Sequence, residues 1–207
     1  MRAFENVTVV CDWKTVEDAI AVRAVLESFR LRVQFLRLVQ RRQVFDFFAG
    51  RGVSDCSYTV LVCHGTGTDA DPTIRLQVVD QVTGDPYAPE GWEVATVELS
   101  AATIADTVTA ARGTLVSTAC GSGREPLAAA FLAAGYDAYV APVGRYHDSD
   151  AAVLFVAGFF YHLLAEDRDY AATAYTEVEA VRRAASIDRD SRFGTGVFRH
   201  YSAKGLR

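Results

Sequence analysis

Residues 58–67 read YTVLVCHGTG, and residues 114–123 read TLVSTACGSG. Each stretch is a short apolar run that stops at a glycine-rich segment, which is typical of a buried strand ending in a turn. An apolar run without alternation fits a parallel strand that is covered on both faces. The first turn carries His64 and the second carries Cys120. Together the two stretches predict a parallel sheet with two reactive side chains near one edge.

Strand-like and helix-like segments alternate along the rest of the chain. Besides 58–63 and 114–119, strands are predicted at 6–13, 32–39, 137–143 and 194–202. Helices are predicted at 15–29, 41–50, 100–111, 125–135, 149–166 and 170–186. This order predicts a single α/β domain over residues 1–207, with a mostly parallel central sheet of about six strands and helices on both faces.

Two local features refine this prediction. Residues 74–99 break the alternation of strands and helices, because two alternating segments flank the turn-rich TGDPYAPEG. They predict an inserted β-hairpin. Thr15 precedes the first helix and Asp18 follows three residues later, so Thr15 is predicted as the helix N-cap.

Composition limits the classes of function. The chain has 207 residues, half of them apolar, and a formal net charge of −5. It is long enough to bury a sizeable core, and its arginines are too scattered for a nucleic-acid-binding stripe. The N-terminus lacks a signal-peptide apolar region, and the longest apolar stretch, 151–165, is too short to cross a bilayer. We expect a cytoplasmic chain without nucleic-acid or membrane partners, whose four cysteines are free thiols.

His64 and Cys120 predict nucleophilic chemistry if their strands are neighbours. Neighbouring strands lie about 4.8 Å apart, so both side chains can face one substrate bond. A thiol near an imidazole ionises readily, and the imidazole can donate the proton to a leaving group. Gly65 and Gly121 let backbone amides approach a developing oxyanion. Each residue alone is more often structural, as we interpret Cys11, Cys56 and Cys63 to be.

Other motifs do not fit the sequence. A tyrosine-phosphatase loop needs arginine where this chain has Pro126, and a hydrolase elbow needs glycine where it has Thr118 and Ser122. With only two lysines, the chain has no Gly-Lys-Ser/Thr phosphate loop. No Cys and His pair stands at zinc spacing, so we expect no metal and no cofactor. CGSGRE, at 120–125, can still hold a phosphate before a helix, which leaves a nucleotide-binding regulator as an alternative.

The order of VLVCHGTG (60–67) and LVSTACGSG (115–123) resembles the caspase-like cysteine peptidases. That family places His-Gly after its third strand and Ala-Cys after its fourth. The segment YVAPVGRYHDSDAAVLFVAGFFYHLL (139–164), with its Phe160-Tyr161 pair, is similar to the CHAT branch related to separase. GVFRHYS (196–202) is similar to the closing strand of that branch. The resemblance covers about residues 5–202 and implies a caspase-like three-layer sandwich.

The resemblance also implies an activity and its residues. Cys120 is expected to attack a scissile carbonyl, and His64 to protonate the leaving amine and then assist water. Backbone amides of Gly65 and of the Cys120–Gly121 segment are expected to hold the oxyanion. No third catalytic residue is required in this family. The expected activity is that of a cysteine endopeptidase acting on a protein or peptide substrate.

Specificity in this family depends on charged groups near the first and fifth strands. Here these groups are Asp12, Asp148 and Asp150, which imply a substrate with Arg or Lys at P1. The chain departs from metacaspases and legumain, which carry an acid just before the cysteine, where this chain has Ser117-Thr118-Ala119. The acids can instead be solvated or cap a helix. Acidic P1 residues would need Arg145 or Arg124.

Partners are expected mainly through the resemblance. Small bacterial caspase-like proteins often accompany larger partners, antiphage defence systems included, so an activating protein partner is expected. Trp13, Trp92 and Tyr146 are candidate substrate-contacting aromatics. A silent caspase-like scaffold is the main alternative, although such proteins usually lack the cysteine or the histidine.

Overall fold

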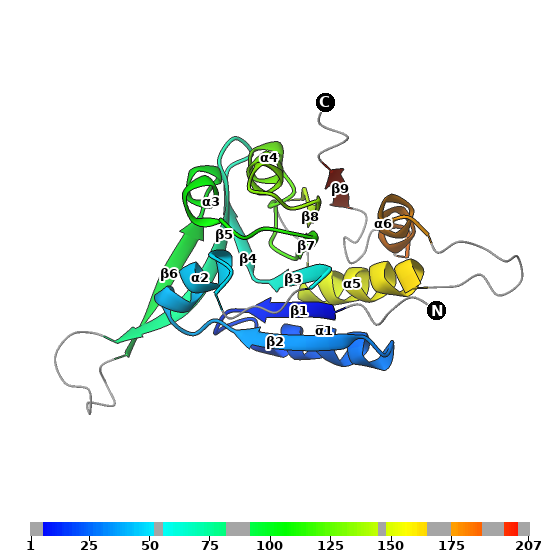
Figure 1. Cartoon of the computed structure of the whole chain (residues 1–207), viewed down its shortest axis with the longest axis horizontal. Helices are drawn as coiled ribbons and strands as arrows, with labels where there is room; N and C mark the ends of the chain where they lie inside the picture. Colours follow the sequence, from blue (N-terminus) through cyan, green and yellow to red (C-terminus); the bar gives the residue numbers. More distant parts are fainter. Residues whose placement is uncertain are drawn as a thin grey trace, which may run out of the picture.

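A six-stranded sheet runs through the centre of the molecule. The computed structural model describes residues 6–51, 56–81, 92–144, 148–164, 175–187 and 197–202. The sheet has the order β2-β1-β3-β7-β8-β9, and β9 alone among these strands is antiparallel to its neighbour (Figure 1). The strands are β1 (Asn6–Cys11), β2 (Arg32–Arg37), β3 (Tyr58–Val62), β7 (Thr114–Ser117), β8 (Ala138–Pro142) and β9 (Phe198–Ser202). The predicted α/β class and mostly parallel sheet are confirmed.

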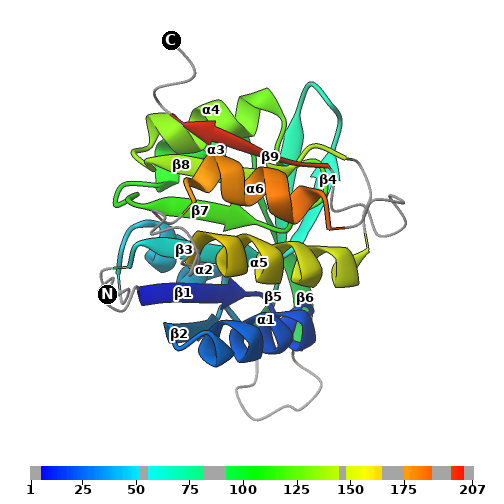
Figure 2. The same ribbon diagram turned by 90° about the vertical axis from the view of Figure 1, so that its right-hand side faces the viewer.

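Within the described residues, three helices pack against each face of this sheet, and Figure 2 shows one group in front of the sheet and the other behind it. One face carries α1 (Val16–Ser28), α5 (Ser149–Leu164) and α6 (Glu177–Ala185), and the other carries α2 (Arg41–Phe48), α3 (Ala101–Thr107) and α4 (Glu125–Ala133). Successive strand residues alternate between the faces: Val60 packs with the first group and Leu61 with the second. Both are fully buried, which explains the unbroken apolar run of β3.

A second sheet stands beside the first and contains the inserted hairpin. It has the order β4-β5-β6 and is antiparallel, with β4 (His64–Gly67), β5 (Pro72–Gln81) and β6 (Trp92–Leu99). Ile74, Leu76 and Leu99 are fully buried and join the core on the α2, α3 and α4 face. The hairpin is therefore as predicted. Strand β4 is not, because HGTG has the composition of a turn and becomes a strand only by pairing with β5.

Helix boundaries agree with the sequence pattern, with local differences. Gly50 follows α2 with φ +74°, the left-handed conformation expected after a helix. Helix α3 ends at Thr107, four residues earlier than predicted. Helix α6 begins at Glu177, and the predicted helix start near residue 170 lies outside the described residues. Thr15 occupies the N-cap position of α1, but its side chain makes no capping hydrogen bond. That hydroxyl contacts Asp12 and Val62 instead, as described below.

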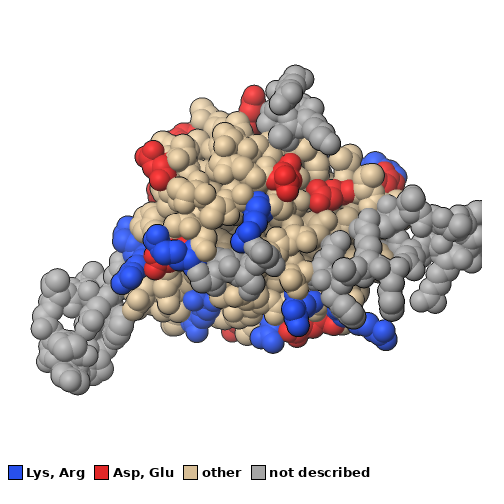
Figure 3. Space-filling model, in the orientation of Figure 1, with Lys and Arg blue, Asp and Glu red and all other residues tan. Residues whose placement is uncertain are grey.

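Figure 3 shows how charged side chains are distributed on one face of the molecule. The acidic side chains lie mostly in the upper half of that view, and the basic side chains lie mostly in the lower half and at the left, in separate patches. Across the described residues, none of the helices has the length and apolar character needed to span a bilayer.

Candidate functional site

His64 and Cys120 follow two strands that are hydrogen-bonded neighbours. β3 pairs with β7 in parallel, with Leu61 opposite Ser117. The amide of Thr118 donates to the carbonyl oxygen of Leu61 at 3.0 Å, which extends the pairing past the end of β7. The predicted nucleophilic chemistry requires these two strands to be neighbours, and they are. Both residues lie at the carboxyl edge of the sheet, where α/β proteins place their functional groups.

Thr118 connects the two strand ends just before the reactive residues. Its hydroxyl donates to the carbonyl oxygen of Leu61 at 3.4 Å and accepts from the amide of Cys63 at 3.3 Å. Thr118 is buried, and so is Cys63, whereas the next residue, His64, is exposed. The histidine therefore projects from a fixed backbone into solvent-accessible space.

Gly65 brings the histidine segment into backbone contact with the nucleophile segment. A Cβ atom at position 65 would lie 1.9 Å from the carbonyl oxygen of Cys120 and 2.8 Å from its amide nitrogen. No side chain fits in that space, so the two segments can approach this closely only with glycine at position 65. The spacing of His64 and Cys120 therefore depends on a residue without a side chain.

A buried polar network holds the turn that carries Cys120. The hydroxyls of Ser117 and Ser122 share a hydrogen bond of 3.0 Å, and the Tyr139 hydroxyl donates to the Ser122 carbonyl oxygen at 3.1 Å. Tyr201 donates from its hydroxyl to the Gly123 carbonyl oxygen. Gly121, inside the turn, has φ +69°, a conformation that favours glycine. β7, β8 and β9 therefore all contribute to positioning the cysteine.

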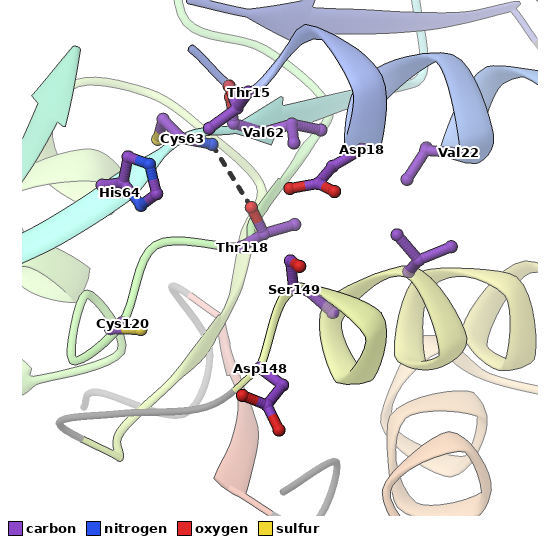
Figure 4. Close-up of a pocket in the computed structure, with 12 residues that line it drawn as sticks. Thr15, Asp18, Val22, Val62, Cys63, His64, Thr118, Cys120, Asp148 and Ser149 are labelled. Carbon is purple, nitrogen blue, oxygen red and sulfur yellow. Dashed lines mark hydrogen bonds between the residues drawn. The ribbon is translucent and has the colours of Figure 1, made fainter. Parts of the chain in front are cut away.

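His64 and Cys120 line the same cavity, which has a volume of about 260 Å³ (Figure 4). Its wall comes from the ends of β3 and β7, the first turns of α1 and the start of α5. Two of its lining residues are acidic, Asp18 and Asp148, and none is lysine or arginine. In Figure 4 these two carboxylates lie away from the histidine and cysteine, across the pocket. The cavity therefore brings together a thiol, an imidazole and two carboxylates.

Asp18 was predicted only as part of a helix cap, and its side chain lies in the cavity wall. Burial raises the pKa of Asp18 above its ordinary value, the Asp150 carboxylate raises it further, and His64 acts in the opposite direction. A signal for this position exists in the sequence. A helix that follows a parallel strand begins at the carboxyl edge of the sheet, so its first turn faces the functional end.

Asp12, expected from the resemblance to contact substrate, has a structural position instead. It is fully buried and does not line the cavity. One carboxylate oxygen accepts from the amides of Lys14 and Thr15 and from the Thr15 hydroxyl at 2.9, 2.8 and 2.8 Å. The other oxygen accepts from the amide of Gln77 at 2.8 Å. A carboxylate with four internal donors is already engaged by the protein and does not reach a substrate.

The remaining predicted specificity residues lie at the start of α5. Asp148 lines the cavity, and its carbonyl oxygen accepts from the amides of Ala151 and Ala152 in the first turn of that helix. Asp150 is exposed and is close enough to Asp18 to affect its pKa, but it does not line the cavity. Arg124 lies in a different cavity, and Arg145 and Tyr146 fall outside the described residues. Trp13 is exposed, with the Arg37 guanidinium 5.3 Å from its ring centre, and Trp92 begins β6.

The other three cysteines differ from Cys120 in their surroundings. All four are free thiols. Burial raises the pKa of Cys63 well above its ordinary value and the pKa of Cys11 to about 11, and the Asp12 carboxylate adds to both shifts. Cys56 is half-buried but lies beside the start of β3, at the opposite end of the sheet. Cys120 is therefore the half-buried thiol at the edge where His64 lies.

The segment CGSGRE is poorly suited to hold a phosphate. The amides of Ser122, Gly123 and Arg124 donate to the carbonyl oxygens of Ala119, Pro142 and Gly121, at 3.1, 2.8 and 3.3 Å. A phosphate cradle needs such amides to point at the ligand. Among the described residues, no three His, Cys, Asp or Glu side chains gather as metal ligands would.

Comparisons with known proteins add no family. No protein-family model matches the chain, and no curated protein is similar to it at a significant level. The fold and the site therefore define a structural class of protein, without assigning the chain to a family. It is an α/β protein with a mostly parallel sheet, and a histidine and a cysteine share an acidic cavity at the carboxyl edge of that sheet.

Proposed function

We propose that the protein is a caspase-like cysteine endopeptidase that cleaves polypeptides after a basic residue, with Cys120 as nucleophile and His64 as proton carrier. The observation that carries this proposal is the shared cavity of His64 and Cys120, with the backbone of Gly65 against that of Cys120. Two reactive groups from separate segments, held by neighbouring strands, match what covalent catalysis requires.

The strand order supports the resemblance to the caspase-like peptidases. The histidine follows the third strand of the sheet along the chain, and the cysteine follows the fourth. The last strand, β9, is antiparallel beside β8. A Cys and His pair at these positions is the arrangement that the resemblance implies.

In the proposed reaction the Cys120 sulfur attacks the scissile carbonyl carbon as its proton passes to His64. The amides of Gly65 and of the Cys120–Gly121 segment stabilise the negative charge on the carbonyl oxygen. The C–N bond then breaks, the imidazolium of His64 gives its proton to the departing amine, and a thioester remains on Cys120. Water, losing a proton to His64, hydrolyses the thioester. The new carboxyl terminus leaves and the thiol is restored.

Asp18 and Asp148 support a preference for lysine or arginine at P1. A cation in this cavity relieves the unfavourable setting of the Asp18 carboxylate, whose pKa is raised by burial and by Asp150. Among the described residues, no arginine or lysine lines this cavity. Asp12, engaged internally, is not part of this proposed pocket.

Covalent labelling tests the nucleophile directly. The full-length protein is treated with peptidyl acyloxymethyl ketones that carry Lys, Asp or Ala at P1, and the modified residue is located by peptide mapping. We expect the Lys probe to modify Cys120, and Cys120→Ala or His64→Ala to abolish labelling. Cys56→Ala is the matched control, because Cys56 is also half-buried. Labelling that maps to Cys56, or that persists in Cys120→Ala, contradicts the assignment, and no labelling by any probe favours a silent binding module.

The acidic pocket is tested by Asp18→Asn, with Glu17→Gln as its neighbour control outside the cavity. We expect Asp18→Asn to reduce the rate of labelling by the Lys probe about tenfold, and to leave the rate with the Ala probe nearly unchanged. The raised pKa of Asp18 means that its ionised form is disfavoured in the folded chain. The ionised carboxylate therefore reduces stability above its ordinary pKa, and Asp18→Asn should not lower Tm at neutral pH. Equal loss with both probes would refute the charge role.

A further inference from the structure

Cys120 also lines a second cavity, of about 260 Å³ as well. Among the described residues, Cys120 is the one that lines both cavities. The wall of the second cavity contains none of the aspartates that line the first cavity and does not contain His64. It is formed by the histidine segment and the cysteine turn, and its residues are Gly65, Thr66, Gly67, Thr68, Asp69, Pro72, Cys120, Gly121 and Arg124.

The floor of the second cavity is a strand with little side-chain bulk. β4 alternates glycine and threonine after His64, and it has β5 on one side but no strand on the other within the described residues. The turn after β4 is closed by two hydrogen bonds, from the Thr68 amide to the Asp71 carbonyl oxygen at 3.1 Å and from the Asp71 amide to the Thr68 hydroxyl at 3.0 Å. A polypeptide backbone can approach such a strand closely.

Arg124 gives the second cavity a cation, which the first lacks. It stands at the N-cap position of α4, and its side chain is 31% exposed. Its guanidinium pairs with Asp69 at 3.2 Å, and Asp69 is 52% exposed. The Arg124 Nε is buried without a hydrogen-bond partner among the described residues. A half-buried guanidinium that pairs with one exposed carboxylate can also donate hydrogen bonds to a second carboxylate, supplied by a ligand.

We infer that the second cavity binds the substrate residues that follow the scissile bond, and that Arg124 selects an acidic side chain at P1′ or P2′. This inference rests on the proposed function. If the P1 side chain fills the first cavity, its carbonyl group lies at the amides of Gly65 and Gly121, which line the second cavity. The chain beyond that carbonyl group then continues along β4 toward Arg124. The preferred cleavage sequence is basic before the bond and acidic after it.

Peptide binding tests this inference without any need for turnover. The full chain carrying Cys120→Ala is titrated with fluorescent peptides that have Lys at P1 and a single Glu or Gln at P3, P2, P1′ or P2′, and anisotropy gives Kd. We expect Glu at P1′ or P2′ to bind about tenfold more tightly than Gln, and Glu at P2 or P3 to give no gain. Arg124→Gln should remove the gain.

Asp69→Asn is the matched control, because it frees the same guanidinium without removing it. It should increase the preference for Glu, an effect that general damage to the cavity would not produce. Equal Kd values for Glu and Gln peptides, absence of binding by both, or a gain confined to P2 or P3 overturns the inference. Acyloxymethyl ketones carry no residues after the scissile position, so labelling of Cys120 together with equal Kd values overturns only this inference. If the chain binds the Glu peptides selectively but is neither labelled nor able to cleave peptides, the proposed peptidase activity is wrong and the peptide-binding site at Arg124 is supported.

Discussion

The contact between Gly65 and the backbone of Cys120 sets the separation of the two segments that carry His64 and Cys120. A methyl group at position 65 would overlap the Cys120 carbonyl oxygen, with 1.9 Å between the two atoms. By contrast, a methyl group at Gly121 would have the Gly144 carbonyl oxygen, 3.7 Å away, as its nearest neighbour. The two glycines of the candidate oxyanion hole therefore have different reasons for being glycine: close approach at 65 and a positive φ at 121.

Gly65→Ala is expected to lower kcat/KM about a hundredfold, because the two segments must separate and a displacement of about 1 Å costs that much. Gly121→Ala serves as the comparison for stability. It introduces strain of about 1–2 kcal/mol from its φ, without a steric overlap. Peptide cleavage and thermal unfolding of both variants check this. If Gly65→Ala retains wild-type kcat/KM, the close approach is not needed for catalysis.

At the scale of elements, Glu177 at the start of α6 joins the helix to three strands of the central sheet. Its carboxylate accepts from the hydroxyls of Tyr58 and Thr114, at 3.0 and 2.8 Å, and lies 3.2 Å from the Nε2 atom of His200. Burial alone would raise the pKa of Glu177, but the hydrogen bonds from His200, Thr114 and Tyr58 outweigh it and lower the pKa below its ordinary value. The ionised carboxylate therefore stabilises the fold.

Glu177→Gln is expected to reduce the free energy of unfolding by about 1–2 kcal/mol at neutral pH. Because the folded pKa is lowered, this contribution is present above the ordinary pKa of glutamate and is lost as the pH falls through the folded value. Wild type and variant should therefore converge in stability in acid. Glu179→Gln is the control, because Glu179 lies on the same helix and its carboxylate pairs with Arg182 and Arg183 rather than with the sheet. A difference that stays constant down to low pH would contradict the assignment.

The elements differ in how far their sequences predicted them. The apolar run of β3 and the glycine after α2 depend only on nearby residues, so hydrophobic periodicity and turn chemistry are enough to predict these two features. β4 was not predicted, since HGTG becomes a strand only through β5, which follows it in the chain. Asp18 has the spacing of a capping residue, and its place in the cavity depends on α5, more than a hundred residues later.

The candidate site shows the same limit at the scale of the whole molecule. Neighbouring strand ends bring His64 and Cys120 to one edge, as the order of elements predicted. The position of Asp12 at the end of a strand is the same whether it faces substrate or the interior. Its engagement by the Gln77 amide, 65 residues away in the sequence, could not be derived from local pattern. The sequence predicted a charged side chain at the end of this strand, but not whether that side chain faces the substrate or the protein interior.

Asp12→Asn tests the structural role of this carboxylate. The asparagine oxygen can keep the donors from Lys14 and Thr15, but its amide group then faces the Gln77 amide, donor against donor. We expect a loss of about 2–3 kcal/mol in the free energy of unfolding, measured by urea titration. A loss below 0.5 kcal/mol, the size usual for surface changes, would show that the bond to Gln77 contributes little.

The same carboxylate also bears on the order of events in folding. Asp12 joins the end of β1, the start of α1 and the middle of β5. Three of its hydrogen bonds are local, to Lys14 and Thr15, and the fourth, from the Gln77 amide, forms only when β5 is in place. Contacts that close such a long loop are formed late, and their loss accelerates unfolding more than it slows folding. A chevron plot of Asp12→Asn should therefore show its change mainly in the unfolding limb, with a φ-value near zero. The bond that links the Thr15 end of α1, and with it one wall of the cavity, to β5 would then form only as the whole chain becomes native.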